Sequence, residues 1–339
     1  MPALIGGFGK TKINNIKKFY SVQIQKNIKL ESKESESKIT SDLSESELII
    51  RSKLGAYLAG LIEADGSFAI HDKYSKAKRY LPKILIVFSI NDRPLADKLI
   101  SITKVGKLYD KSRQGCMIWQ IQKIEDVIKT INLINGFMRT PKIEALYRAI
   151  KWYNLYSHTN IELKGIDESS IDSNAWLAGF SDGDGNFSIN LVDRKKKGLI
   201  TTKRVQAFFR IELRQTYHRD ISLEQGGTSY FNILNIIARY LGVNLYSRSR
   251  ENKDKIFYSY IVISHSIKNH TKVIEYFNRY PLYSSKYLAY KDWKYVVEQL
   301  ILRGGKPLLP AQILEIVSIK AQFNKNRIIF DFSHLDSIV

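Results

Sequence analysis

Two nine-residue blocks of this chain are near-copies of each other, 119 positions apart (58 to 177). The first reads LAGLIEADG and spans 58–66, and the second reads LAGFSDGDG and spans 177–185. Each block is followed by a polar residue and a phenylalanine, and then by a run in which polar and apolar residues alternate. This pattern predicts a helix that ends with the block and a strand that begins directly after it. The chain therefore contains two copies of one unit, and each copy ends its first helix in a carboxylate.

The same order of elements is predicted after both blocks. In the first copy we expect a helix over 53–64, two strands, a helix over 93–103, two further strands, and helices that end near 155. The second copy repeats this order from 173 to 302, and a last amphipathic helix is expected over 311–323. The predicted fold class is therefore α+β, with the same order of helices and strands in two repeats.

The chain is divided into four parts on this basis. We assign a leader and a charged linker to 1–50, the first repeat with an interdomain linker to 51–170, the second repeat to 171–302, and a C-terminal helical extension to 303–339. The serine-rich, charged stretch at 31–47 contains too little apolar surface to offset the entropy of ordering, so we expect it to be disordered.

The charge of the chain restricts its partners. Lys and Arg number 53 against 33 Asp and Glu, which gives a net charge of +20. A surplus of this size indicates a polyanionic partner, with nucleic acid ahead of an anionic membrane, although a basic protein with a merely solvated surface is the alternative.

The single cysteine, Cys116, excludes an internal disulfide and a cysteine-based zinc cluster. No apolar run has the length of roughly 18 residues that a membrane span needs.

Small residues recur at every fourth position of both predicted block helices. They are Ala56, Gly60 and Ala64 in the first copy, and Ala175, Gly179 and Gly183 in the second. Such a strip forms a flat face on which two helices can approach until their backbones nearly touch. Two ordinary amphipathic helices that end in glycine caps are the alternative. Because glycine inside a helix costs about 1 kcal/mol relative to alanine, its presence in both copies favours the close approach.

The last acids of the blocks, Asp65 and Asp184, are expected to meet at this interface. Each lies at the carboxyl end of its helix, where the helix dipole disfavours negative charge, and pairing the helices adds like-charge repulsion. Divalent cations between the acids and a phosphate would remove both penalties and would supply a Lewis acid. Glu63 and Asp182 lie two residues earlier, about 200° around the helix, and we expect them to face solvent or form salt bridges.

A strand predicted at 204–215 carries a row of polar side chains on one face. The candidate contacts to nucleic-acid bases on this face are Arg204, Gln206, Arg210 and Arg214, with their counterparts in the first copy. The candidate contacts to phosphates are Lys195, Lys196, Lys197, Arg248, Arg250 and Lys255. An ordinary solvated sheet face is the alternative, and the cluster of arginines favours a role in groove recognition.

The two blocks and the repeated order of elements resemble the LAGLIDADG homing endonucleases, in the branch that carries two repeats in one chain. The resemblance covers about 51–302 and the C-terminal helix. It implies two αββαββα halves related by pseudo-twofold symmetry, whose saddle-shaped antiparallel sheets lie in the DNA major groove. It also implies cleavage of both strands, with Mg²⁺ bound by the last acid of each block, here Asp65 and Asp184, and we expect Mn²⁺ to substitute.

Three further residues are carried over from the resemblance. A lysine near the water at the metal is matched by Lys142 and Lys286, each of which opens a predicted helix. Phosphate contact or plain solvation is the alternative for both lysines. A glutamine in the water network is matched by Gln215, whereas the first half offers Asn91 or Asp92 in its place. The resemblance therefore predicts unequal halves of the site.

The first nine residues, MPALIGGFG, resemble a segment of cytochrome c oxidase subunit 1. The chain thus resembles endonucleases encoded by fungal mitochondrial group I introns in the gene for that subunit. The partner implied is double-stranded DNA at the exon junction, cut by a monomer in the mitochondrial matrix. A maturase that binds its own intron RNA and assists splicing is the alternative function. A basic ribosome-associated or general DNA-binding protein would explain the charge but not the paired acids.

Overall fold

The computed structural model describes residues 45–70, 81–196, 199–219, 221, 227–252 and 255–338. The chain divides into two compact units, Met1–Arg51 and Ser52–Val339, and both nine-residue blocks lie in the second. The predicted leader and most of the linker predicted to be disordered lie outside the described residues. Helix α2 (Glu45–Asp65) begins eight residues before the predicted start at 53. The linker prediction is therefore wrong for 45–50, where leucine and two isoleucines follow an acidic first turn.

The first repeat follows the predicted order of elements. After α2 come β1 (Gly66–Ala69), β2 (Lys83–Ser89), α3 (Arg93–Thr103), β3 (Lys107–Lys111), β4 (Cys116–Ile121), α4 (Ile124–Ile134) and α5 (Ile143–Tyr156). The strands form one antiparallel sheet in the order β1-β2-β4-β3. Helix α3 begins where predicted, with a proline in its first turn, and ends where Lys104 adopts a left-handed conformation.

The second repeat has the same topology. Its elements are α6 (Trp176–Asp184), β5 (Gly185–Lys196), β6 (Leu199–Arg214), α7 (Phe231–Leu241), β7 (Leu245–Asn252), β8 (Lys255–Ser264), α8 (Ile267–Arg279) and α9 (Lys286–Leu302). Its antiparallel sheet has the order β5-β6-β8-β7. The α+β fold class with two αββαββα repeats is confirmed. Helix α10 (Pro310–Ala321) and two short 3₁₀ helices follow in the C-terminal extension.

Each sheet has one buried face and one open face. Along β6, Val205, Ala207, Phe209 and Ile211 are buried, as the alternating sequence predicts. The core beneath them contains aromatic side chains of the covering helices, among them Phe277 of α8, whose ring lies 5.6 Å from that of Phe209. The other faces of the two sheets are free for a partner. None of the described helices is long and apolar enough to cross a lipid bilayer.

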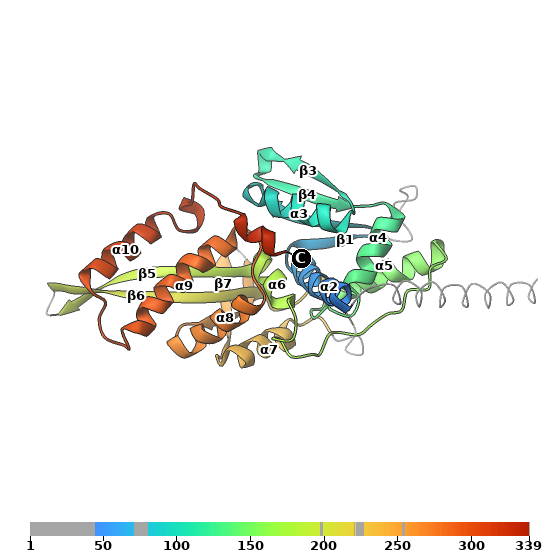
Figure 1. Ribbon diagram of the computed structural model, residues 1–339. Helices are drawn as coiled ribbons and strands as arrows, with labels where there is room; N and C mark the ends of the chain where they lie inside the picture. The colour runs from blue at the N-terminus through green and yellow to red at the C-terminus, as the bar shows by residue number, and fades with distance from the viewer. Residues whose placement is uncertain are drawn as a thin grey trace, which may run out of the picture. The chain divides into compact units, whose positions relative to one another are not determined.

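The block helices α2 and α6 lie side by side where the two repeats meet, as Figure 1 shows. Most of both helices is buried, including Tyr57, Leu58 and Ile62 of α2 and Trp176 and Phe180 of α6. Strands β1 and β5 start directly after these helices, at Gly66 and Gly185. The helix pair therefore fixes the point from which both sheets extend.

Candidate functional site

The contact between α2 and α6, called the seam below, is a contact of backbones. A Cβ atom built on Gly60 would lie 2.0 Å from the carbonyl oxygen of Trp176, and one built on Gly179 would lie 1.9 Å from that of Tyr57. No side chain larger than hydrogen fits at either position. Among the other predicted interface residues, a Cβ on Gly183 would lie 2.2 Å from that of Ala64, while Ala56 and Ala175 are buried.

The seam brings Asp65 and Asp184 together. One carboxylate oxygen of Asp65 would lie 3.1 Å from a Cβ on Gly183, the residue that precedes Asp184. Burial and the neighbouring Asp65 carboxylate together raise the pKa of Asp184 to about 6, against the opposing effect of Lys286 and Lys142. Burial also raises the pKa of Asp65, against the opposing effect of Lys286 and Lys142. Two carboxylates that repel each other in a half-buried setting favour the binding of a cation or a proton.

Lys142 and Lys286 lie at the ends of these two helices. Each ammonium group donates hydrogen bonds to the last carbonyls of the block helix of its own repeat. The acceptors of Lys142 Nζ are the carbonyl oxygens of Ile62 at 3.1 Å, Ala64 at 3.3 Å and Gly66 at 2.9 Å, and those of Lys286 Nζ are the carbonyl oxygens of Ser181 and Gly183. The last carbonyls of a helix are incompletely paired within it, and a cation there offsets the negative end of the dipole. Burial lowers the pKa of both lysines, and the nearby acids oppose that shift.

The expectation that Glu63 faces solvent or forms a salt bridge is wrong. Its side chain is only 3% exposed. The carboxylate accepts hydrogen bonds from the backbone N–H groups of Arg139 and Thr140, from the Thr140 hydroxyl at 2.6 Å, and from Trp176 Nε1 across the seam at 2.6 Å. Glu63 therefore joins three elements: its own helix, the loop before α5, and the block helix of the other repeat.

Asp182 makes the matching set of contacts from the other side, so the same expectation is wrong for it. It accepts hydrogen bonds from the Tyr57 hydroxyl across the seam at 2.7 Å, from Tyr283 N at 2.8 Å, and from the backbone and hydroxyl of Ser284. A helical wheel places these two acids on the correct side of their helices, but that side faces the partner helix and a loop and not solvent. The sequence feature that could have indicated these contacts is a hydroxyl residue two positions before each lysine, Thr140 before Lys142 and Ser284 before Lys286.

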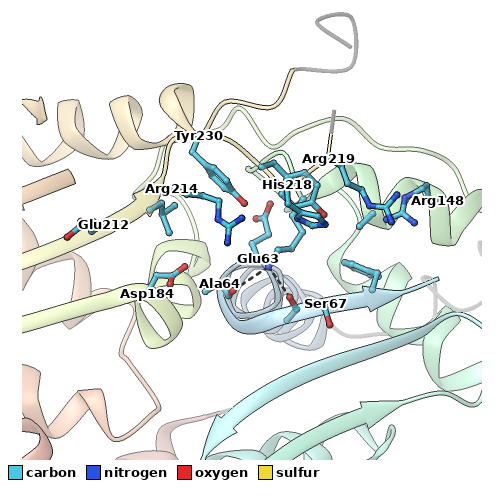
Figure 2. A pocket seen from close by; sticks show the side chains of 16 residues that line it. Glu63, Ala64, Ser67, Arg148, Asp184, Glu212, Arg214, His218, Arg219 and Tyr230 are labelled. Atoms are coloured by element: carbon cyan, nitrogen blue, oxygen red, sulfur yellow. Dashed lines mark hydrogen bonds between the residues drawn. The ribbon is translucent and has the colours of Figure 1, made fainter. Parts of the chain in front are cut away.

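A cavity of about 480 Å³ opens beside Lys142 and Asp184. Its walls include the basic side chains of Arg148, Arg214 and Arg219, together with Glu63 and Tyr230. Figure 2 shows Arg214, Tyr230 and Glu63 close together in the cavity, with Asp184 on one side and Arg148 and Arg219 on the other. Such a concentration of guanidinium groups next to two acids suits a phosphate group that approaches the seam.

The surroundings of Lys286 carry fewer cations. Asp92, only 8% exposed, accepts a hydrogen bond of 2.6 Å from Ser285 N, and burial raises its pKa. The C-terminal extension packs here: His334 Nε2 lies 3.1 Å from the carbonyl oxygen of Tyr283, and its ring stacks on Tyr287 at 4.1 Å. This role of the extension was not predicted from the sequence.

The structure does not bring the side chain of Gln215 into contact with the paired acids and the two lysines. Its side-chain amide donates to Ser247 Oγ at 2.6 Å, and it is absent from the walls of the cavity that Arg214 lines. The backbone N–H of Gln215 donates to the Tyr258 carbonyl oxygen of β8 at 3.1 Å, and its side chain reaches Ser247 of β7. Of the two candidates in the first half, Asn91 is exposed and Asp92 lies beside Lys286.

The predicted nucleic-acid contacts lie on the second sheet. Arg204, Arg214, Arg248, Arg250 and Lys255 are exposed, and Gln206 and Arg210 are half-buried. Glu212 accepts hydrogen bonds from Arg250 at 2.7 and 2.8 Å and lies 3.8 Å from Arg210. Lys195 and Lys196 belong to β5, and Lys197 lies outside the described residues.

The donors at the seam fit a magnesium ion that is completed by substrate. Mg²⁺ is commonly held by one or two carboxylates, with waters and phosphate oxygens as the remaining ligands. Asp65 and Asp184 offer those carboxylates, and burial, joined at Asp184 by the charge of Asp65, raises the pKa of both. Within the described ranges no cluster of three or more His, Cys, Asp or Glu residues could hold an ion by itself.

Known proteins show the same architecture. The chain is 39% identical over 99% of its length, and over 81% of the relative, to "Intron-encoded DNA endonuclease aI3" of Saccharomyces cerevisiae. It is 31% identical over 78% of its length to "Uncharacterized cox1 intron-2 37.2 kDa protein" of Schizosaccharomyces pombe, 71% of which is covered. A solved structure, the LAGLIDADG homing endonuclease I-GzeII in complex with its DNA target, matches the fold with a TM-score of 0.57 at 18% identity, covering 81% of this chain and 99% of that chain.

The two repeats also match the sequence pattern of one family, described as LAGLIDADG endonuclease, over residues 58–153 and 177–297. Each matched segment begins at a block helix and extends past the lysine at the start of α5 or α9. With two matched repeats, the paired acids at the seam and a close relative over its full length, the chain belongs to the LAGLIDADG endonuclease family, in its double-motif branch.

Proposed function

We propose that this protein is a site-specific, magnesium-dependent DNA endonuclease that hydrolyses one phosphodiester bond in each strand. The observation that supports this most strongly is the meeting of Asp65 and Asp184 at the seam, each beside a lysine. The acids would hold Mg²⁺, which when bound supplies a Lewis acid and lowers the pKa of a water molecule. Mn²⁺ is expected to substitute.

The residues of the chain divide the remaining tasks. Asp65 and Asp184 bind the cations between them, and their backbone positions are fixed by the seam. Lys142 and Lys286, whose pKa values are lowered by burial, hold or move a proton at Nζ beside the reacting water. Arg148 binds the phosphate at the cavity and offsets the charge that develops on it. Gln215 is left out of this mechanism because its amide is turned to Ser247.

The open sheet faces would bind the DNA duplex. Arg204, Gln206, Arg210 and Arg214 would contact base edges, and Arg248, Arg250 and Lys255, with Lys195, Lys196 and Lys197, would contact phosphates. A net charge of +20 supports a polyanionic partner. Both acids come from one chain, which supports a monomer that cuts both strands.

The proposed target is the intronless gene for cytochrome c oxidase subunit 1, in the DNA that spans the codons for Gly6–Gly9 and the exon downstream. The leader sequence and the relative named for a cox1 intron support this choice. A protein of this origin would act in the mitochondrial matrix, and cleavage there would promote homing of its intron.

The test is digestion of a plasmid that carries this exon junction by the purified full-length chain. Cleavage is expected with Mg²⁺ or Mn²⁺ and not with EDTA. Asp65→Asn and Asp184→Asn should each lower double-strand cleavage by about a thousandfold, since a metal ion supplies several kcal/mol of stabilisation to the transition state. Both variants should still bind DNA, because removing a negative charge beside a phosphate does not weaken the binding.

Asp97→Asn, which changes an exposed acid on α3, is the matched control and should cut normally. Equal loss of binding and cleavage in the Asp65 and Asp184 variants would contradict a catalytic role for these acids. If the wild-type chain leaves this junction uncut but binds its intron RNA and accelerates splicing, the maturase function replaces the endonuclease function.

A further inference from the structure

The open faces of the two sheets can be compared position by position. Gly66 pairs with Ile86 on β2, and Gly185 pairs with Ile211 on β6, so the two sheets share a register with an offset of 125 (86 to 211). In this register Leu85 corresponds to Arg210, Val87 to Glu212, and Ser89 to Arg214. These residues alternate with the buried residues of their strands and therefore lie on the open faces.

One row of the two open faces carries similar residues on its neighbouring strands, whereas in the next row Leu85 pairs with Gln120 and Arg210 pairs with Ile263. Val87 pairs with Ile118 on β4, which pairs with Tyr109 on β3. The matching row of the second sheet runs from Glu212 through Ile261 to Tyr246, so isoleucine and tyrosine recur at both outer positions. Within the described parts of both sheets, the pronounced difference in this row lies on the second strand, where an apolar residue replaces a charged one.

The second strand of the first sheet cannot hydrogen-bond to bases at two of these positions. Val87 is 44% exposed and Leu85 is half-buried, and neither side chain carries a donor or an acceptor. In the major groove only thymine presents a methyl group, which is the base feature that an apolar side chain recognises. A valine and a leucine on the open face therefore match thymine methyl groups.

The second strand of the second sheet offers the opposite chemistry. Arg210 and Arg214 can each donate paired hydrogen bonds, the contact that distinguishes guanine through its O6 and N7 atoms. Glu212 lies between them and holds Arg250 through hydrogen bonds of 2.7 and 2.8 Å. This pairing restricts the guanidinium group of Arg250 to the open face of the sheet.

We propose that the two half-sites of the DNA target are read by different chemistry: the first sheet recognises thymine methyl groups through Leu85 and Val87, and the second recognises guanine through Arg210 and Arg214. The inference rests on the proposed function, in which both open faces contact the duplex. It assigns specificity to Leu85 and Val87, which the sequence alone did not single out, and it makes the target unequal in base composition on the two sides of the cleavage position.

The first experiment selects bound duplexes from a library with a randomised core, using the full-length chain without divalent cations so that binding is measured and cleavage is not. The enriched sequence should contain T·A pairs in one half and G·C pairs in the other at positions near the centre. Leu85→Arg and Val87→Arg should each introduce a guanine preference in the thymine half only. Arg210→Leu should remove a guanine preference in the other half only.

The second experiment alters single atoms of the enriched DNA. Replacing thymine by deoxyuridine removes the C5 methyl group, and each replacement in the thymine half should weaken binding by about fourfold, the worth of one buried methyl. The same replacement in the other half should have no effect. Replacing guanine by 7-deazaguanine removes the N7 acceptor and should weaken binding by about tenfold in the guanine half, because one hydrogen bond to a charged donor is lost.

The outcomes separate the two levels of inference. Enrichment with equal guanine content in both halves, or deoxyuridine replacements without effect, would overturn the assignment of Leu85 and Val87 and leave site-specific binding intact. Absence of any enriched sequence would overturn the proposed site-specific function itself. Leu85 is half-buried, so thermal unfolding checks the fold of Leu85→Arg, and the exposed position of Val87 provides the variant that tests the inference if Leu85→Arg does not fold.

Discussion

The surroundings of Lys142 and Lys286 are alike next to the helix ends and different farther out. Each ammonium group caps the block helix of its own repeat, and the backbone N–H of each lysine donates to the hydroxyl two residues before it at 3.2 Å. That hydroxyl, from Thr140 or Ser284, in turn donates to the buried acid of the block. The contacts that run from the buried acid through the hydroxyl to the lysine are therefore the same in both repeats.

The charges around this shared arrangement have diverged. Arg148 lies six residues after Lys142, whereas Asp292 lies six residues after Lys286. Asp292 forms an ion pair with Arg327 of the C-terminal extension, so a cation from outside the repeat faces it. The comparison teaches that the geometry of the two halves is constrained by packing, while the electrostatic environment of each half is free to adapt to its own DNA strand.

The largest effect is expected from removing each lysine. Lys142→Met and Lys286→Met should each slow cleavage of one strand by roughly 10²–10⁴-fold, the usual contribution of a positioned proton donor or acceptor. Single-turnover digestion of a duplex with each strand labelled separately measures both rates, and thermal unfolding confirms the fold of each variant. Equal slowing of both strands by either variant would show that the halves do not act separately.

The next effect concerns the seam, where the two repeats should respond alike. Gly60→Ala and Gly179→Ala place a methyl group about 2 Å from a backbone carbonyl oxygen, and each should lower the free energy of unfolding by about 3 kcal/mol or more. Gly165→Ala is the control, because a Cβ there meets nothing within 4 Å. Denaturant unfolding measures all three. A loss for one seam glycine and not the other would contradict the close contact at both positions.

Replacing the buried acids tests whether their hydrogen bonds are equivalent. Glu63→Gln and Asp182→Asn each turn an amide N–H₂ toward groups that are themselves donors, and should lower the free energy of unfolding by about 2 kcal/mol. Glu125→Gln, at an exposed position on α4, should have no effect. Stability unchanged in both block variants would mean that these carboxylates do not hold the loops before α5 and α9.

The pH dependence should distinguish Asp184 from Asp65. The pKa of Asp184 in the folded chain is raised to about 6 from its ordinary value of 3.8, so the folded state binds more protons than the unfolded state between these values. The free energy of unfolding without metal should therefore fall by about 1–2 kcal/mol as the pH rises from about 4 to about 6, allowing for water at this half-exposed carboxylate. Asp184→Asn should flatten this slope more than Asp65→Asn does.

Calorimetry of Mg²⁺ binding across the same range provides a second readout, because protons compete with the cation. Binding should weaken below a pH of about 6 and become independent of pH above it. Two results would contradict the assignment of this pH dependence to Asp184. One is a free energy of unfolding that rises between pH 4 and 6, and the other is an equal pH dependence in Asp184→Asn and the wild-type chain.

The smallest effect is expected from exchanging the residues that end β2 and β6. Arg214→Ser should weaken DNA binding by about tenfold and lower the slope of log affinity against log salt by about 1, since one phosphate or base contact is lost. Ser89→Arg should raise that slope by about the same amount. Gel-shift titrations at several salt concentrations measure both, and a slope unchanged in both variants would place these residues off the DNA.

Much of the fold could be predicted because its signals are local. The alternation along β6 predicted its buried face, and helices α3 and α9 occupy the predicted residues. The small residues of the blocks predicted the seam, which fixes where Asp65 and Asp184 lie. The start of α2 was missed because a serine-rich, acidic stretch reads equally well as a linker or as the first turn of a helix.

The rest of the site depends on contacts between distant parts of the chain. The partners of Glu63 lie 76, 77 and 113 residues away, so the sequence gives its direction on the helix but not what it meets. His334 and Arg327 reach the second half from an extension whose path no local pattern indicates. The partner of Gln215, Ser247, lies 32 residues away, so the pattern along the strand does not indicate what its side chain meets.

The two acids of each block differ in what their loss would cost, and this leaves a trace that homologous sequences can record. Asp65 is exposed at the helix end, whereas Glu63 is enclosed by donors from two other elements. A descendant that stopped cutting DNA could lose Asp65 and Asp184 by drift and still fold, but it would have to keep Glu63 and Asp182. Counting which pair survives among divergent members would therefore separate lineages that abandoned cleavage from those that still depend on it.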